Sequence, residues 1–125
     1  MKLSYWILVA LFTFNNTYSQ DSIIQSVENN YKTSVEFEAI NIDSSLFYIK
    51  KAYEGLKVVD TLNPQFTDIL NQYGRLFYQK QDFEKAYTYF QRCYDISLLD
   101  EREEDAYKVK VNMAVCHRQM DNPAQ

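Results

Sequence analysis

The chain has 125 residues, the size of a single domain, and its 13 basic and 17 acidic residues give a net charge of −4. Hydrophobic residues make up 46% of it, so a core can be buried, and the presence of only 2 Gly and 2 Pro argues against a β-sandwich or barrel. No basic stripe is present, so the sequence offers no electrostatic footprint for nucleic acid or an anionic lipid surface.

The first residues have the three-part pattern of a secretory signal peptide. Met1 and Lys2 give a positive start, residues 3–14 are almost wholly apolar, and small Thr17 and Ser19 stand at the −3 and −1 positions of a cleavage site. The apolar run is shorter than the roughly 18–20 residues that span a bilayer. We therefore expect a signal peptide that is cleaved after its nineteenth residue. A buried N-terminal helix or an uncleaved anchor is the alternative.

The rest of the chain, residues 20–125, is predicted to form helices joined by short turns. Apolar residues recur at i, i+3 and i+4 over residues 22–38, 45–59, 64–78, 83–99 and about 101–120. Asp43 or Ser44 is expected to cap the second of these helices, Asn63 the third, ahead of Pro64, and Asp82 the fourth.

The third and fourth predicted helices share a distinctive spacing, L-x2-Y-G-x2-F and then, after eight residues, A-x3-F-x2-C. The residues concerned are Leu70, Tyr73, Gly74, Phe77, Ala86, Phe90 and Cys93, with Phe83 at the start of the fourth helix. This spacing resembles the tetratricopeptide repeat (TPR), W-x2-L-G-x2-Y followed by A-x3-F-x2-A. Small Gly74 and Ala86 let two antiparallel helices approach closely, and the large aromatic residues fill the space around them.

The spacing recurs at an offset of 40–41 residues. Residues 45–53 match 86–94, which aligns Ala52 with Cys93, and residues 112–117 match 72–77, which aligns Ala114 with Gly74. The predicted units are 22–60, 64–100 and an incomplete 101–125, each about six residues longer than the 34-residue TPR norm. The opening helix of the first unit lacks the signature of a small residue beside an aromatic one. The resemblance implies an all-α, TPR-like α-solenoid of antiparallel helix pairs in a right-handed superhelix.

The TPR resemblance also implies a binding module and not an enzyme, because such helix pairs offer a surface and no chemistry. We expect a protein or peptide partner, no nucleic acid, and no cofactor. Membrane contact is expected only through the signal segment or a C-terminal region beyond residue 125. Asn71, Arg75, Tyr78 and Tyr87 are candidates for the inner groove on which TPR proteins hold peptides.

The last residues, from Met120 onward, resemble the turn into a further helix. The last predicted helix would then leave Val111, Met113, Val115 and Met120 facing water, where a solenoid normally has a polar cap. We therefore expect the N-terminal part of a longer, exported bacterial protein, periplasmic or membrane-associated. It is either a scaffold or adaptor, or the sensor arm of a membrane-anchored histidine kinase or helix-turn-helix regulator. A complete protein that dimerises through this end is the alternative.

No residue set predicts catalysis or metal binding. Cys93 and Cys116 lie on neighbouring predicted helices, so either a disulfide or two small core residues fits the pattern. His117 follows Cys116 directly, and adjacent helical residues point to different sides, so the two do not form a nucleophile–base pair. The acidic run 100–105 lacks the ligand spacing of a calcium loop and is expected to begin a helix, where carboxylates favour the helix dipole.

Overall fold

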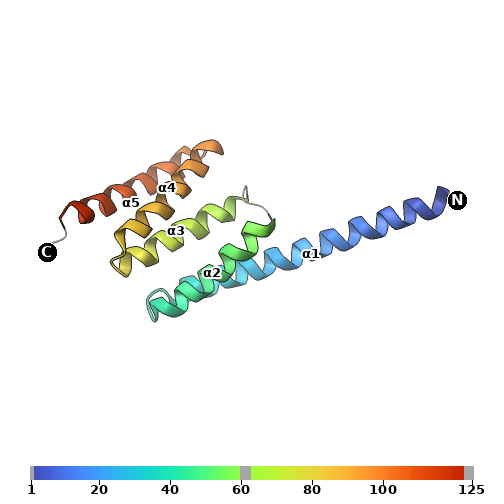
Figure 1. Ribbon diagram of the computed structural model, residues 1–125, viewed down its shortest axis with the longest axis horizontal. Coiled ribbons are helices and arrows are strands. Elements are labelled where there is room, and N and C mark those ends of the chain that lie inside the picture. The colour runs from blue at the N-terminus through green and yellow to red at the C-terminus, as the bar shows by residue number, and fades with distance from the viewer. Residues whose placement is uncertain (1, 60–62, 123–125) are drawn as a thin grey trace.

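The computed structural model describes the backbone of residues 2–59 and 63–122 and the side chains of residues 19–57 and 63–122. These residues contain five helices and no strand: α1 (Lys2–Phe37), α2 (Ile42–Val59), α3 (Pro64–Gln79), α4 (Phe83–Leu99) and α5 (Glu103–Asp121). Helices that follow one another in the chain pack together, and α1 extends far beyond the other four (Figure 1). The predicted all-α fold of helix pairs is therefore confirmed as an all-α helical repeat.

The starts of α3 and α4 are set by the predicted caps. The Oδ1 atom of Asn63 accepts a hydrogen bond from the backbone N–H of Gln65 at 3.0 Å, and that of Asp82 accepts one from the backbone N–H of Lys85 at 3.3 Å. The acidic run 100–105 leads into α5 as expected, with three carboxylates in its first turn.

The predicted start of α2 is wrong. The helix begins at Ile42, because the side chain of Asn41 accepts a hydrogen bond from the backbone N–H of Ser44 at 2.9 Å. Asp43 and Ser44, the two expected caps, therefore lie inside the first turn. The cap stands two residues earlier than the apolar pattern indicated, because a capping side chain leaves no mark in that pattern.

Helix α1 begins far earlier than the predicted residue 22. Its helical backbone runs without a break through the point where cleavage is expected, and the side chains of the apolar segment lie outside the described residues. Within the part of the chain that the structure describes, no helix is both long and apolar enough to cross a membrane.

The core runs through α1–α5 and is built from aliphatic and aromatic side chains around a few small residues. Its largest fully buried members are Phe66, Ile49, Leu56, Ile69, Leu70, Leu76, Val27 and Cys116. The predicted close approach of α3 and α4 occurs at Gly74, where a β-carbon would overlap the ring of Phe90. Ala86, one turn before Phe90, is completely buried. Small residues thus set the distance between these two helices.

The first unit has its own pair of small residues, of which the sequence comparison aligned Ser45 with Ala86 but did not identify Ser34. Ser34 and Ser45 are completely buried, and each hydroxyl donates to the other residue's carbonyl oxygen, at 2.9 Å and 2.7 Å. Ser34 lies 40 residues before Gly74, and Ser45 lies 41 residues before Ala86. Serine can take these positions because, when its hydroxyl is satisfied by the facing backbone, it packs almost as closely as alanine.

Candidate functional site

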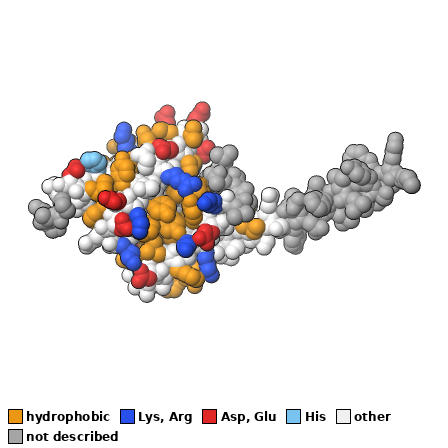
Figure 2. Space-filling view, viewed as in Figure 1, with side chains coloured by type: hydrophobic (Ala, Val, Ile, Leu, Met, Phe, Trp, Pro, Cys, Tyr) orange, Lys and Arg blue, Asp and Glu red, His pale blue; other side chains and the backbone are white. Residues whose placement is uncertain are grey.

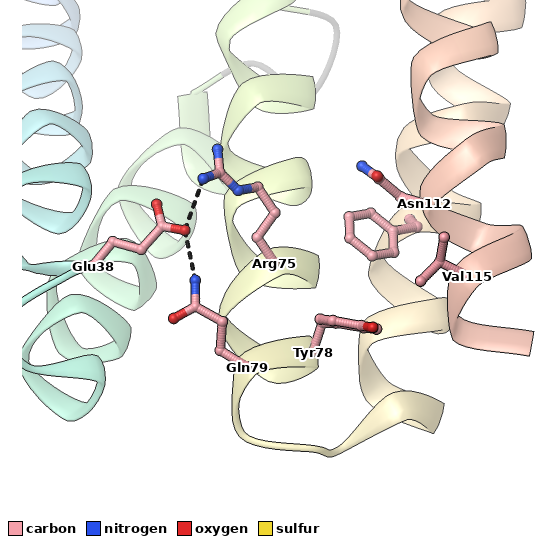
Figure 3. A pocket seen from close by; sticks show the side chains of 7 residues that line it. Glu38, Arg75, Tyr78, Gln79, Asn112 and Val115 are labelled. Carbon is pink, nitrogen blue, oxygen red and sulfur yellow. Dashed lines mark hydrogen bonds and ion pairs between the residues drawn. The ribbon is translucent and has the colours of Figure 1, made fainter. Parts of the chain in front are cut away.

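A concave feature with apolar walls lies where the end of α1 meets α3, α4 and α5. It is a pocket of about 170 Å³, shown in Figure 3, and its lining residues are Glu38, Arg75, Tyr78, Gln79, Phe90, Asn112 and Val115. The pocket is polar on the side of α1 and apolar on the side of α5. A shallow depression continues from its polar side over residues 38–43.

The polar side is organised around one carboxylate. The Oε1 atom of Glu38 accepts hydrogen bonds from Arg75 Nη2 at 2.8 Å and from Gln79 Nε2 at 2.7 Å, and Oε2 accepts one from Gln72 Nε2 at 3.1 Å. The three donors stand at i, i+3 and i+7 of α3, so they lie on one stripe of that helix. Beside them, burial raises the pKa of the Tyr31 hydroxyl, and the carboxylates of Asp68 and Glu38 add to the shift.

The apolar side is formed by Tyr78, Phe90 and Val115. Phe90 is only 2% exposed, and it is held in place by its contact with Gly74. Figure 3 shows Val115 and Asn112 projecting from α5 toward the side of the pocket on which Tyr78 lies. Residues from four parts of the chain therefore build one pocket whose two sides differ in polarity.

A second, smaller cavity of about 60 Å³ lies further along α3, between α4 and α5. Asn112 Nδ2, which lines the first pocket, donates to Asn71 Oδ1, which lines the second, at 3.4 Å. The floor of the second cavity includes the buried hydroxyl of Ser97, for which no hydrogen-bond partner is found among the described residues. At its edge, desolvation and the nearby carboxylate of Asp105 raise the pKa of Asp68.

The other side of α3 carries a cluster of aromatic rings, which we call the aromatic seam: Tyr53, Phe66, Tyr73, Phe77 and Tyr89. Tyr73 stacks on Tyr89 with ring centroids 4.5 Å apart, and Tyr53 of α2 stacks on Phe66 at 5.5 Å. The guanidinium of Arg92 lies over the Tyr53 ring and donates to its hydroxyl at 2.6 Å. Figure 2 shows apolar side chains gathered over α3, flanked by α2 and α4, with charged side chains around them.

Burial also raises the pKa values of two tyrosines in the aromatic seam. Desolvation, followed by the neighbouring phenols, raises the pKa of the Tyr73 hydroxyl, and desolvation followed by Tyr53 raises that of Tyr89. The seam joins α2 to α3 and α4, and it contains no described cavity.

The structure buries most of the predicted repeat positions and leaves one exposed. Leu70, Tyr73, Gly74, Ala86, Phe90, Cys93 and Ala52 are buried, and Phe77 and Phe83 are half-buried. Ala114, expected to be a close-packing position, is exposed, because no helix within the described residues covers that side of α5. Val111 is also exposed, at 48%, as predicted, whereas Met113 packs against the core and Val115 lines the pocket.

Two of the four groove candidates, Arg75 and Tyr78, line the main pocket, and Asn71 lines the smaller cavity. Tyr87 lies on α4, bonded to Gln91, and lines none of the described cavities. Sequence reasoning missed Glu38 and Gln79. The only signal in the sequence was that Glu38 lies about one repeat period, 40 residues, before Arg75 and Gln79.

Both cysteines carry free, buried thiols. Cys93 and Val109 line one cavity, and Cys116 stands seven residues further along α5, roughly 10 Å at 1.5 Å per residue. A disulfide needs Cα atoms within about 7 Å, so this register does not support one. Burial raises the pKa of Cys93 to about 11 and also raises that of Cys116. His117 Nδ1 lies 2.9 Å from Asp121 Oδ2 on the exposed side of α5.

Comparison with known proteins yields no match for this chain: no protein-family model, no curated protein and no solved structure corresponds to it. The fold places the chain in the class of all-α helical repeats. Its pocket spans the helix pairs and is polar on one side and apolar on the other.

Proposed function

We propose that this chain is a non-enzymatic protein-interaction module of the TPR type, which binds a protein or peptide segment in the pocket between α1, α3 and α5. The observation that carries the proposal is the pocket itself, which takes one lining residue from α4 and the others from α5, α3 and the turn after α1. A site built across repeats suits an extended chain, because such a ligand runs past several helices in turn. The spacing around Gly74 supports the TPR type.

The chemistry of the lining supports binding over catalysis. The pocket combines apolar walls with amide and guanidinium donors, a composition typical of sites that hold a side chain and its adjacent peptide groups. The one carboxylate in it, Glu38, is engaged with three donors and has no second carboxylate beside it among the pocket residues. General acid–base chemistry would need a group free to exchange a proton with a substrate.

We further propose, from the N-terminal pattern, that the module acts in an exported protein, in the periplasm or at a membrane. The charged start, the apolar segment and the small residues before Gln20 support this location. Mass spectrometry of protein recovered from the exported fraction tests it: an N-terminus at Gln20 supports export, and an intact Met1 confined to the cytoplasm contradicts it.

The binding proposal is tested by selecting peptides from a random library on the purified protein and measuring their affinity for pocket variants. Val115→Arg places a charged side chain in the apolar wall, and Val111→Arg makes the same change one turn away on α5, outside the pocket. Loss of a desolvated apolar contact typically costs about 1.4 kcal/mol or more, so Val115→Arg should weaken binding at least about tenfold. Equal affinity for both variants, or no selectable peptide, would refute the proposed site.

A further inference from the structure

The hydrogen-bond donors on this side of α3 are already bonded to a carboxylate of the chain itself. Arg75, Gln79 and Gln72 all donate to Glu38, and the Glu38 side chain is only 11% exposed whereas that of Arg75 is 53% exposed. These three donors on α3 form a binding site for an anion, and the carboxylate of Glu38 occupies that site. Figure 3 shows the Glu38 carboxylate between the ends of Arg75 and Gln79, on the side of the pocket away from α5.

This arrangement decides the charge of the pocket. Arg75 is the only cation among the lining residues, and Glu38 neutralises it at 2.8 Å. A ligand carboxylate that entered the pocket would therefore lose water without gaining an unpaired cation, and it would lie close to the negative charge of Glu38. A neutral ligand meets neither cost.

The volume of the pocket limits the size of the ligand group that can enter it. A cavity of about 150 Å³ lined by apolar residues is known in other proteins to hold a benzene molecule, and this pocket measures about 170 Å³. Phe90, Tyr78 and Val115 offer ring and methyl surfaces to such a group. Asn112 stands at the edge, with a side-chain amide suited to a ligand's peptide group.

We propose, resting on the function proposed above, that the pocket takes one uncharged, apolar side chain of a peptide that has no carboxylate beside it. Glu38 is the residue that sets this preference, by occupying the anion position on α3. The partner is thus a neutral apolar peptide segment, and acidic segments and free C-termini are rejected.

The test uses two small probes that differ only in a carboxylate: N-acetyl-leucine amide, which is neutral, and N-acetyl-leucine, which is anionic. Each is titrated into the purified protein, and the amide signals of Asn112 and Val115 are followed by NMR. The unmodified protein should bind the neutral probe at least about threefold more tightly. Glu38→Gln keeps an acceptor for the glutamine amides but frees Arg75, so it should reverse the order.

Two further variants make the outcome decisive. Glu36→Gln removes an exposed carboxylate near the end of α1 that does not line the pocket, and it should leave the probe ratio unchanged. Arg75→Gln leaves Glu38 without its cation and should widen the preference for the neutral probe. This measurement still decides the matter if Glu38→Gln does not fold.

The possible failures are distinguishable. If both probes shift the pocket signals equally in the unmodified protein and in the Glu38 and Arg75 variants, the pocket binds side chains but Glu38 does not select them, and this inference falls. If neither probe shifts any pocket signal at millimolar concentration, the proposed binding site itself is wrong.

Discussion

Helix α3 is held by its neighbours in two different ways. Against α4, within its own repeat unit, it packs closely through Gly74 and Phe90. Against the α1–α2 hairpin, across the unit boundary, the packing is less extensive, and it includes the Tyr53 ring on one side and the Glu38 carboxylate on the other. Close packing therefore fixes α3 within its unit, whereas a few specific side chains help to place it against the first unit. The pocket lies at this second kind of junction.

The largest effect should come from the contact within the unit. Phe90→Ala removes a ring that is 2% exposed, and large-to-small changes of this kind in a core cost about 3–5 kcal/mol because they leave a cavity. Chemical denaturation measures the loss. Phe47→Ala, at a site that is 54% exposed, is the control and should cost less than about 1 kcal/mol. A loss of stability at Phe90 as small as that at Phe47 would contradict close packing between α3 and α4.

The second test adds volume at the same contact. A methyl group at Gly74 meets three atoms of the Phe90 ring, so Gly74→Ala should destabilise the protein by about 1–3 kcal/mol, and Gly74→Leu by at least as much. Gly55→Ala is the matched control, because its methyl group meets only one atom of Val27, at 2.9 Å, and the better helix propensity of alanine, about 1 kcal/mol, offsets that contact. Thermal unfolding of the two variants should differ clearly. Equal melting temperatures would argue against the close packing.

The third test addresses the aromatic seam across the unit boundary. Tyr53→Leu keeps apolar volume but removes the stacking on Phe66 and the edge contacts with Tyr73 and Tyr89. An aromatic pair contributes about 0.5–1.5 kcal/mol beyond its buried area, so a loss of that order is expected in denaturant unfolding. Tyr107→Leu, at a side chain that is 70% exposed, should have no measurable effect. A similar result for both would mean that the seam does not join the units.

The fourth test addresses the polar side of the same boundary. Glu38→Gln should lower stability by no more than about 1 kcal/mol, because Arg75 is largely exposed and ion pairs near the surface are weak. Its larger consequence is local: hydrogen exchange of the α1–α2 turn should become faster while that of α4 stays unchanged. Faster exchange in both regions would show that loss of the Glu38 contacts at the boundary also destabilises the packing within the unit.

The smallest effect is expected from the cysteines. Both thiols are buried and free, and Cys93 has a pKa of about 11, so almost no thiolate, the reactive form, exists at pH 8. Alkylation by iodoacetamide in native buffer should therefore leave both cysteines unmodified by mass spectrometry, whereas alkylation in denaturant should modify both. A reductant should not change the melting temperature; a decrease would reveal a disulfide.

The local features of this protein could be predicted from its sequence. Helix periodicity depends on residues three and four apart, and a cap depends on residues two or three apart, so the helices, the caps of α3 and α4 and most core positions could be predicted. The repeat spacing also located the close approach at Gly74. The same reasoning failed for α2, where the capping side chain of Asn41 lies outside the apolar pattern.

The site, in contrast, depends on how the helices pack in three dimensions. The partners of Glu38 lie 34, 37 and 41 residues away, and Phe90 and Val115 reach the same pocket from different helices. Periodicity shows which side of a helix is apolar, but not which helix covers it or which side chain meets a given carboxylate. Those pairings depend on the distances between helices, which small residues such as Ser34 and Gly74 set. Ala114 is a further example. Its spacing predicted a close contact with another helix, but the sequence pattern could not show whether a helix covers that position.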